Sequence, residues 1–345
     1  MKRLVCTGLA ITAGALMAVA VCVGVVEAQG GQRAPGPQTV NAAAVGDLEV
    51  IQVRPNFYMI AGAGGNIGVQ IGEDGVVLID TGTASRADAV LAAIRRITPG
   101  PIRYLINTNA DPDHVGGNET IAVAGQTLFG GFTTGNAGVF GRGGASIIAT
   151  EKVLERMSTP VGQEAAPYPF VAWPTEAFYQ SRKYLYLNGE GIEVLQQPAA
   201  HTDGDSMVFF RRSDVVVAGD ILDTTRFPVI DVARGGTVQG KIAALNRLVD
   251  MAITSVPLVS REAGTVIIPG HGHVSDQIDA AEYRDMLTVI RDRVRDLIAA
   301  GRTLEQIKAA VPARGYTARY GSTTGPWTTN QFIEAVYHSL RQEKS

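Results

Sequence analysis

The chain has 345 residues, of which 46% are hydrophobic and 18% charged, and its net charge is −3. This apolar content is enough to bury a core and excludes a disordered chain. The sequence shows no basic patch, so we expect a small-molecule substrate and no nucleic-acid partner. Only two cysteines and five histidines occur, and their positions hold most of the functional information.

Residues 1–28 have the pattern of a secretory signal peptide. Lys2 and Arg3 precede an uncharged run from Leu4 to Val26, and small residues lead up to Ala28. We therefore predict cleavage after Ala28 and a periplasmic or secreted protein with no membrane attachment. The alternative is an uncleaved N-terminal membrane anchor, because the apolar run is long enough to span a bilayer.

Both cysteines, Cys6 and Cys22, lie in this segment. The mature chain therefore has no thiol, which excludes a cysteine nucleophile, a cysteine metal ligand and a disulfide. Residues 29–46 are rich in Gly, Pro, Gln and Ala without periodicity, so we predict a flexible linker there. One domain with C-terminal helices is expected over residues 47–345.

The hydrophobic pattern predicts strands and helices in a definite order from residue 48 onward. Strands are expected near 48–54, 57–60, 68–72, 76–79, 102–106, 146–149, 183–187, 192–196, 206–210, 215–218 and 265–268. Helices are expected near 85–97, 151–157, 238–253, 280–300, 304–310 and 330–340. Strands cluster, helices intervene, strands return and helices close the chain. This order predicts an α/β fold in which two sheets are covered by helices on both outer sides.

Polar side chains gather where the predicted strands end. Asp80 ends one strand, the segment Asn109–His114 follows another, and His201, Asp220 and His271 each follow a strand. In layered α/β folds, side chains at strand ends converge on one rim. Imidazole and carboxylate groups together are the usual ligands of a catalytic divalent metal. The pattern therefore predicts a metal site at this rim.

These segments resemble the signature of the metallo-β-lactamase superfamily over about residues 48–274. The family signature is His-x-His-x-Asp-His, then a His near a Gly-Asp-Ser turn, then an Asp ending a strand, and a Gly-His near the end. The matching segments here are Asn109 to His114, Ala200 to Ser206, Ala218 to Asp220, Pro269 to Gly272 and the turn Asp80-Thr81-Gly82. The resemblance implies a four-layer αββα sandwich and metal-dependent hydrolysis.

The resemblance also implies one complete metal site. The family's second site uses residues that match Asp113, His114 and His271, and Asp220 matches its bridging carboxylate. We expect one zinc ion held by these four side chains, with a water molecule that the metal acidifies.

The family's first site is altered in this chain. Its first two histidines are replaced by Asn109 and Asp111, and only His201 remains.

Three interpretations of this altered site follow. In the first, only the complete site binds metal, and His201 or Asp111 acts as general base, so that the candidate catalytic residues are Asp111, Asp113 and His201. In the second, Asn109, Asp111 and His201 bind a second metal, either zinc or a harder ion such as manganese, iron or magnesium. In the third, catalysis is lost and the pocket of a silent protein only binds a ligand or a metal.

The resemblance suggests more than one substrate class. True β-lactamases of the family usually have Cys or Ser at the position of Asp220, whereas an Asp resembles the thioester, lactone and phosphodiester hydrolases. Export, in contrast, is typical of β-lactamases. We expect an ester, lactone or lactam, although the family also includes oxidoreductases. Arg226 is either a clamp for a substrate carboxylate or part of a surface ion pair. No feature of the sequence predicts the oligomeric state.

Two glycine-rich segments are candidate covers for the site. Residues 62–68 match the region where the family places a flexible loop over the substrate. Residues 130–144 follow the metal motif and lack the Gly-Lys-Ser/Thr of a phosphate-binding loop. They form either a second lid or a mobile insertion.

Overall fold

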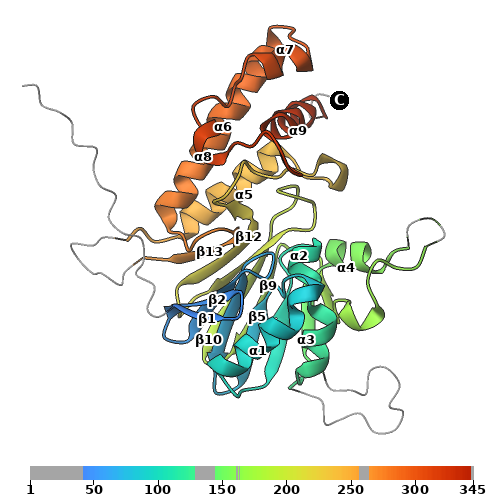
Figure 1. Cartoon of the computed structure of the whole chain (residues 1–345), viewed down its shortest axis with the longest axis vertical. Coiled ribbons are helices and arrows are strands. Elements are labelled where there is room, and N and C mark those ends of the chain that lie inside the picture. Colours follow the sequence, from blue (N-terminus) through green and yellow to red (C-terminus); the bar gives the residue numbers. More distant parts are fainter. Residues whose placement is uncertain (1–41, 129–143, 161, 163, 256–263, 343–345) are drawn as a thin grey trace, which may run out of the picture. The chain divides into compact units, whose positions relative to one another are not determined.

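Two β-sheets form the centre of the fold (Figure 1). A computed structural model describes residues 42–128, 144–160, 162, 164–255 and 264–342. In these residues the first sheet has eight strands, which follow the order of the chain: β1 (Ala42–Val45), β2 (Leu48–Arg54), β3 (Phe57–Ala61), β4 (Ile67–Gly72), β5 (Gly75–Ile79), β6 (Ile102–Ile106), β7 (Ser146–Thr150) and β8 (Glu176–Phe178). The second sheet, again in the described residues, has five strands in the order β13 (Val266–His271), β12 (Val215–Asp223), β11 (Ser206–Phe210), β10 (Glu190–Gln196) and β9 (Arg182–Leu187).

The strand directions bring several carboxyl ends to one edge of each sheet. β1 to β5 are antiparallel, whereas β5, β6, β7 and β8 are parallel. In the second sheet β12 and β13 are parallel. β10 also runs in the direction of β12, because both strands are antiparallel to β11. Loops at the carboxyl ends of such strands are where α/β sheets build sites.

Strand side chains alternate between two apolar layers. In β5, Val77 and Ile79 pack between the two sheets, whereas Val76 and Leu78 pack under the helices of the first sheet. All four are fully buried. Because both faces of the sheet are covered, the strand is a continuous apolar run rather than an alternating one.

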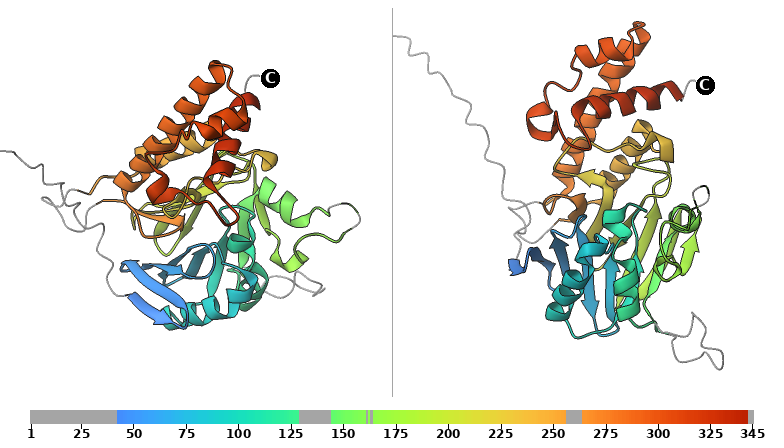
Figure 2. Two further views of the ribbon diagram at one scale, coloured as in Figure 1. Left: turned by 45° about the horizontal axis from the view of Figure 1, so that its top comes forward. Right: turned by 45° about the vertical axis from the view of Figure 1, so that its right-hand side comes forward.

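Helices cover the outer face of each sheet (Figures 1 and 2). The helices in the described residues are α1 (Ala87–Ile97), α2 (Pro112–Val115), α3 (Asn118–Ala124), α4 (Glu151–Ser158), α5 (Val238–Met251), α6 (Gln277–Ala299), α7 (Leu304–Ala309), α8 (Thr317–Tyr320) and α9 (Thr329–Gln342). α1 and α3 pack on the first sheet, and α5, α6 and α9 share an apolar core with the second. The predicted four-layer αββα sandwich is confirmed.

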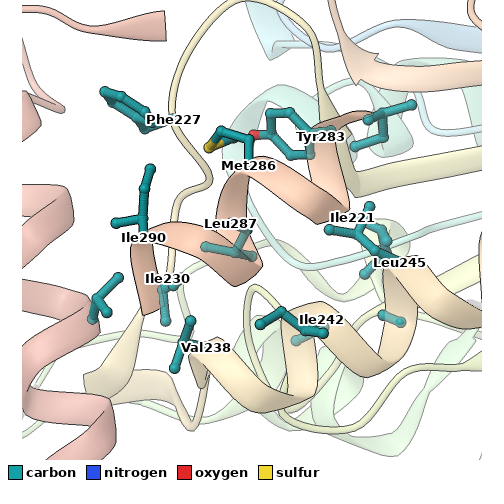
Figure 3. Packing of buried hydrophobic residues seen from close by; sticks show 14 of the residues in the cluster. Ile221, Phe227, Ile230, Val238, Ile242, Leu245, Tyr283, Met286, Leu287 and Ile290 are labelled. Carbon is teal, nitrogen blue, oxygen red and sulfur yellow. The ribbon is translucent and has the colours of Figure 1, made fainter. Parts of the chain in front are cut away.

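The long helix α6 buries a stripe that also reaches the site. Tyr283, Met286, Leu287 and Ile290 have the spacing of one helical face, are almost fully buried and pack toward α5 (Figure 3). The Tyr283 hydroxyl donates to the backbone carbonyl of Arg226 at 3.0 Å. This bond connects the helical layer to a loop that lines the candidate site.

The N-terminal boundary of the sheet differs from the predicted one. The linker predicted over residues 29–46 does not extend through residues 42–45, because Ala42–Val45 pairs antiparallel with β2. The pairing satisfies backbone groups in a segment whose composition shows no strand pattern. The predicted signal peptide and the rest of the linker lie outside the described residues, as does the glycine-rich segment 130–143.

The described residues belong to one compact unit. Within this part of the chain, none of the helices combines the length and the apolar character that crossing a bilayer requires.

Candidate metal centre

Two groups of metal-ligating side chains lie at the common edge of the sheets. In each group, three candidate ligand atoms lie within 4.8 Å of one another. The first group is Asp113, His114 and His271, and the second group is Asp111, His201 and Asp220. The structure therefore brings together the histidine and aspartate ligands predicted from the sequence, and Asn109 contacts Asp220 beside them.

Asp220 belongs to the second group and also faces the histidines of the first. Its Oδ1 is 3.4 Å from Nε2 of His271, and its Oδ2 is 3.3 Å from Nε2 of His114. Nε2 of His271 is also 3.2 Å from Oδ2 of Asp113. With Asp220, the first group offers two imidazoles and two carboxylates, which is a donor set that suits zinc.

His114 is oriented by a buried carboxylate. Its Nδ1 donates to Oδ2 of Asp80 at 2.7 Å, and both side chains are almost fully buried. Asp80 also accepts from the backbone N and Oγ1 of Thr108, at 2.8 and 2.7 Å. This arrangement places the proton on Nδ1 and leaves Nε2 facing the cluster, as in many metal-binding histidines. Among the described residues, Nε2 has no hydrogen-bond partner.

The turn after β5 holds the segment that carries Asp113 and His114. Asp80 has a left-handed backbone with φ +64°, a conformation that costs free energy and often occurs at functional sites. The backbone N of the next residue, Thr81, donates to the carbonyl of His114 at 2.8 Å. The strand end and the short helix α2 are therefore fixed to each other.

Asn109 contacts both the ligand segment and Asp220. Its Oδ1 accepts from the backbone N of Asp111 at 2.8 Å, which shapes the turn before α2. Its Nδ2 donates to Oδ2 of Asp220 at 3.0 Å. Pro112 occupies the first turn of α2, where its missing N–H costs nothing.

Asp220 stands on an irregular part of β12. The pairing of β12 with β13 shifts register between Val217 and Gly219 and again before Asp223. Irregularities of this kind redirect side chains at sites. A Cβ on Gly270 would lie 2.5 Å from Oδ1 of Asp220, so only glycine fits beside this carboxylate. The sequence predicted that Asp220 follows a strand, whereas β12 continues to Asp223.

The loop between β3 and β4 is held against the metal ligands. The backbone N of Gly65 donates to the carbonyl of Asp113 at 3.1 Å. Asn66 donates from Nδ2 to the carbonyls of Pro269 and Gly272, at 3.0 and 2.9 Å, on either side of His271. The expected covering loop therefore packs against the cluster, and no pattern in the sequence indicated this role of Asn66.

The second group contains an ion pair that the sequence did not indicate. Nη1 of Arg234 donates to Oδ1 of Asp111, and its Nε donates to Oδ2 of Asp231, both at 2.6 Å. Oδ2 of Asp111 is 3.6 Å from Nε2 of His201. Nδ1 of His201 lies 3.4 Å from Oδ1 of Asp205 on the other side.

A buried lysine lies behind Asp220. Lys241 lies on the buried face of α5, and its Nζ donates to the backbone carbonyl of Asp220. Burial lowers the pKa of Lys241, while the nearby carboxylates of Asp205, Asp220 and Asp223 act in the opposite direction. A buried cation therefore partly balances the acidic cluster.

The side chains of the cluster shift one another's pKa values. Burial raises the pKa of Asp220, but His114, His201 and His271 outweigh burial and hold this pKa well below its ordinary value. Burial lowers the pKa of His114, and Asp220 and Asp80 outweigh it and raise this pKa well above its ordinary value. A bound cation would replace the imidazole protons, so metal binding at the cluster releases protons.

Both groups open into one cavity of about 190 Å³. Its lining residues come from the segment after β6, from the second sheet and its loops, and from the segment between α8 and α9: Asp111, Asp113, His201, Asp220, Asp223, Arg226, Val229, His271, Pro326 and Trp327. This volume is below the roughly 300–1,000 Å³ of pockets for drug-sized ligands, so it suits a small head group.

The family model of the metallo-beta-lactamase superfamily matches residues 61–308. The chain belongs to this superfamily. The predicted family membership is thereby confirmed, and so is the expectation of a metallo-hydrolase fold.

Relatives within the superfamily include alkylsulfatases. A linear primary-alkylsulfatase of Pseudomonas sp. (strain ATCC 19151) is 22% identical over 301 residues, which cover 78% of this chain and 53% of the relative. The structure of the stereoselective inverting sec-alkylsulfatase Pisa1 from Pseudomonas sp. matches with a TM-score of 0.58 at 18% identity, covering 84% of this chain and 49% of that one. The chain thus spans about half the length of both alkylsulfatases.

A metallo-beta-lactamase from Pontibacter korlensis matches with a TM-score of 0.52 at 17% identity. The match covers 70% of this chain and 99% of that one. At this identity the structural likeness shows the shared fold of the superfamily.

Proposed function

We propose that the protein is an exported, zinc-dependent hydrolase of esters, with negatively charged esters, above all sulfate esters, as its small-molecule substrates. The observation that carries the proposal is the cluster of Asp113, His114, His271 and Asp220, which borders a cavity that Arg226 also lines. Membership of the superfamily and the alkylsulfatase relatives support ester hydrolysis.

The residues of the complete cluster fit a zinc ion. Two imidazoles and two carboxylates face one another, and the buried Nε2 of His114 has no hydrogen-bond partner within the described residues. An orphaned buried nitrogen of this kind is expected where a metal binds. When bound, zinc supplies an acidified water molecule and polarises an oxygen of the substrate. Asp80 keeps His114 in the tautomer that binds metal.

Arg226 provides the charge that an anionic substrate needs. Its Nε donates to Oδ2 of Asp223 at 2.7 Å, which fixes the guanidinium at the cavity. Its two terminal nitrogens make no hydrogen bond within the described part of the chain. They are available to donate to sulfate or carboxylate oxygens. Val229 and Trp327 line the same cavity and suit the organic part of the ester.

His201 is the candidate general base. It lines the cavity, and its Nε2 faces Asp111 at 3.6 Å. Because Arg234 neutralises Asp111, we assign the role of general base to His201. Asp111 then orients the imidazole of His201.

The proposal is tested with zinc-loaded protein on an alkyl sulfate, a carboxyl ester, a lactone and a β-lactam. His114→Ala is expected to lower kcat on every accepted substrate by about 100-fold or more. Arg226→Gln is expected to raise KM for the alkyl sulfate about tenfold and to leave KM for the neutral lactone unchanged. Arg319→Gln, which removes an arginine paired with Glu282 on the surface, is the matched control. If the zinc-loaded wild type hydrolyses none of the panel, the alternative of a catalytically silent binding protein replaces this proposal.

Export rests on the pattern of residues 1–28. The full chain, expressed in a Gram-negative host, is expected in the periplasm with Gln29 as its first residue. N-terminal sequencing of fractionated cells tests this expectation. An intact N-terminus in the membrane fraction would instead support the anchor.

A further inference from the structure

A permanent positive charge lies directly on one candidate metal ligand. Nη1 of Arg234 donates to Oδ1 of Asp111 at 2.6 Å. A guanidinium keeps its proton under all conditions in which proteins fold. Asp111 is therefore already paired with a cation before any metal ion binds.

Arg234 is held in this position from several sides. It ends the 3₁₀ turn Val232–Arg234, and Asp231 accepts from its Nε at 2.6 Å and from its backbone N at 2.9 Å. Nη2 of Arg156 donates to the carbonyl of Arg234 at 2.9 Å. The guanidinium is thus anchored at Asp111 by its own turn as well as by the ion pair.

The other side chains that could bind a second metal ion already contact other groups of the protein. Asn109 uses its Oδ1 on the backbone of Asp111 and its Nδ2 on Oδ2 of Asp220. Asp220 also faces the imidazoles of the complete cluster, and Lys241 adds a buried cation behind it. Nδ1 of His201 faces Asp205 at 3.4 Å. A second divalent ion between Asp111 and His201 would lie next to the guanidinium of Arg234.

We infer that Arg234 takes the electrostatic place of a second metal ion, so that the protein binds one divalent ion per chain, at Asp113, His114, His271 and Asp220. The inference rests on the proposed function only in treating that group as a metal site. In this arrangement Asp111 and His201 bind no metal ion, although they lie next to a metal site, and they act as side chains in the reaction.

The test is the number of zinc ions that metal-free protein binds, measured by calorimetric titration and by elemental analysis after gel filtration. The wild type is expected to bind one equivalent. Arg234→Gln removes the charge and is expected to bind a second equivalent, about tenfold or more tighter than any second step of the wild type. Arg234→Lys keeps the positive charge and is expected to bind one equivalent of zinc, as the wild type does. Arg226→Gln removes an arginine that lines the cavity and is also expected to bind one equivalent.

Two further variants make the result specific to the ion pair. The double variant Arg234→Gln with Asp111→Asn is expected to return to one equivalent, because the freed ligand is removed. Asp231→Asn keeps Arg234 but removes its anchor, so a second, weaker binding step is expected. Circular dichroism checks whether Arg234→Gln folds. If it does not, Asp231→Asn replaces it as the test variant.

The outcomes separate this inference from the proposed function. Two tight equivalents in the wild type would overturn the inference and leave the hydrolase proposal standing. A folded Arg234→Gln variant that stays at one equivalent would also overturn it. A wild type that binds no zinc would instead remove the metal site on which both proposals depend.

Discussion

Oδ2 of Asp80 lies 2.7 Å from Nδ1 of His114, and both side chains are almost fully buried. Asp80 belongs to the turn after β5, whereas His114 belongs to α2, 34 residues further along the chain. The bond fixes which nitrogen of His114 faces the cluster, so the affinity of the metal site depends on a residue that does not bind the metal.

Asp80→Asn is therefore expected to weaken zinc binding about 10- to 100-fold, the range typical of such supporting carboxylates. Asparagine tolerates the left-handed backbone of this position, so the turn is kept. Competition with a chromophoric chelator measures the affinity. Asp205→Asn, which removes the carboxylate beside His201, is the matched control and should leave tight zinc binding unchanged. An Asp80→Asn variant with wild-type affinity would show that Asp80 does not tune the site.

Asn66→Ala is expected to destabilise the protein and to weaken zinc binding together. The substitution leaves the carbonyls of Pro269 and Gly272 without their donor, at a cost of about 1–3 kcal/mol in the free energy of unfolding. His271 lies between these two carbonyls and loses its fixed position. Urea unfolding and zinc titration measure the two effects.

Asn56→Ala is the control for Asn66, because its amide bonds the Ser213 side chain away from the cluster. It should lower stability without changing zinc affinity. Equal losses of affinity in both variants would mean that the effect is a general loss of stability.

Gly65→Ala tests the closeness of the β3–β4 loop to the ligands. An added Cβ would lie 3.0 Å from Cε1 and 3.1 Å from Nε2 of His114. The ring must move, so we expect weaker zinc binding and a loss of about 1–3 kcal/mol in stability. Gly315→Ala adds the same methyl group where no atom lies within 4 Å, and it should change neither quantity. Zinc titration and thermal unfolding of the two variants decide the prediction.

The fold could be predicted from the sequence because its signals are local. The apolar runs of β5 and β12 and the turns that follow them define strands without reference to the rest of the chain. The rule that strand ends meet at one edge then places Asp113, His114 and His271 together. β1 was missed because Ala42–Val45 shows no alternation and becomes a strand only by pairing with β2.

The supporting residues of the site could not be predicted in the same way. Arg234 lies 123 residues from Asp111, and Asn66 lies 203 residues from Pro269. Neither residue type indicates a contact with a distant part of the site, because arginine and asparagine are common on surfaces and in turns. These contacts exist only once the layers have packed.

Lys241 is a further such case, because it shares the buried face of α5 with Ile242, Leu245 and Leu248. An apolar residue is expected at such a position. Its ammonium instead faces the carbonyl of Asp220 and the surrounding acidic side chains. The lysine therefore contributes charge balance to a cluster that is otherwise rich in carboxylates.

Lys241→Met is accordingly expected to destabilise the metal-free protein by about 3 kcal/mol, because buried carboxylates lose a compensating cation. Zinc is expected to restore more stability to this variant than to the wild type, since the ion supplies the missing charge. Thermal unfolding with and without zinc measures both effects. Lys152→Met, which removes an exposed lysine paired with Glu155, is the control and should show neither change. A Lys241→Met variant that is as stable as the wild type without zinc would show that the buried ammonium does not balance the cluster.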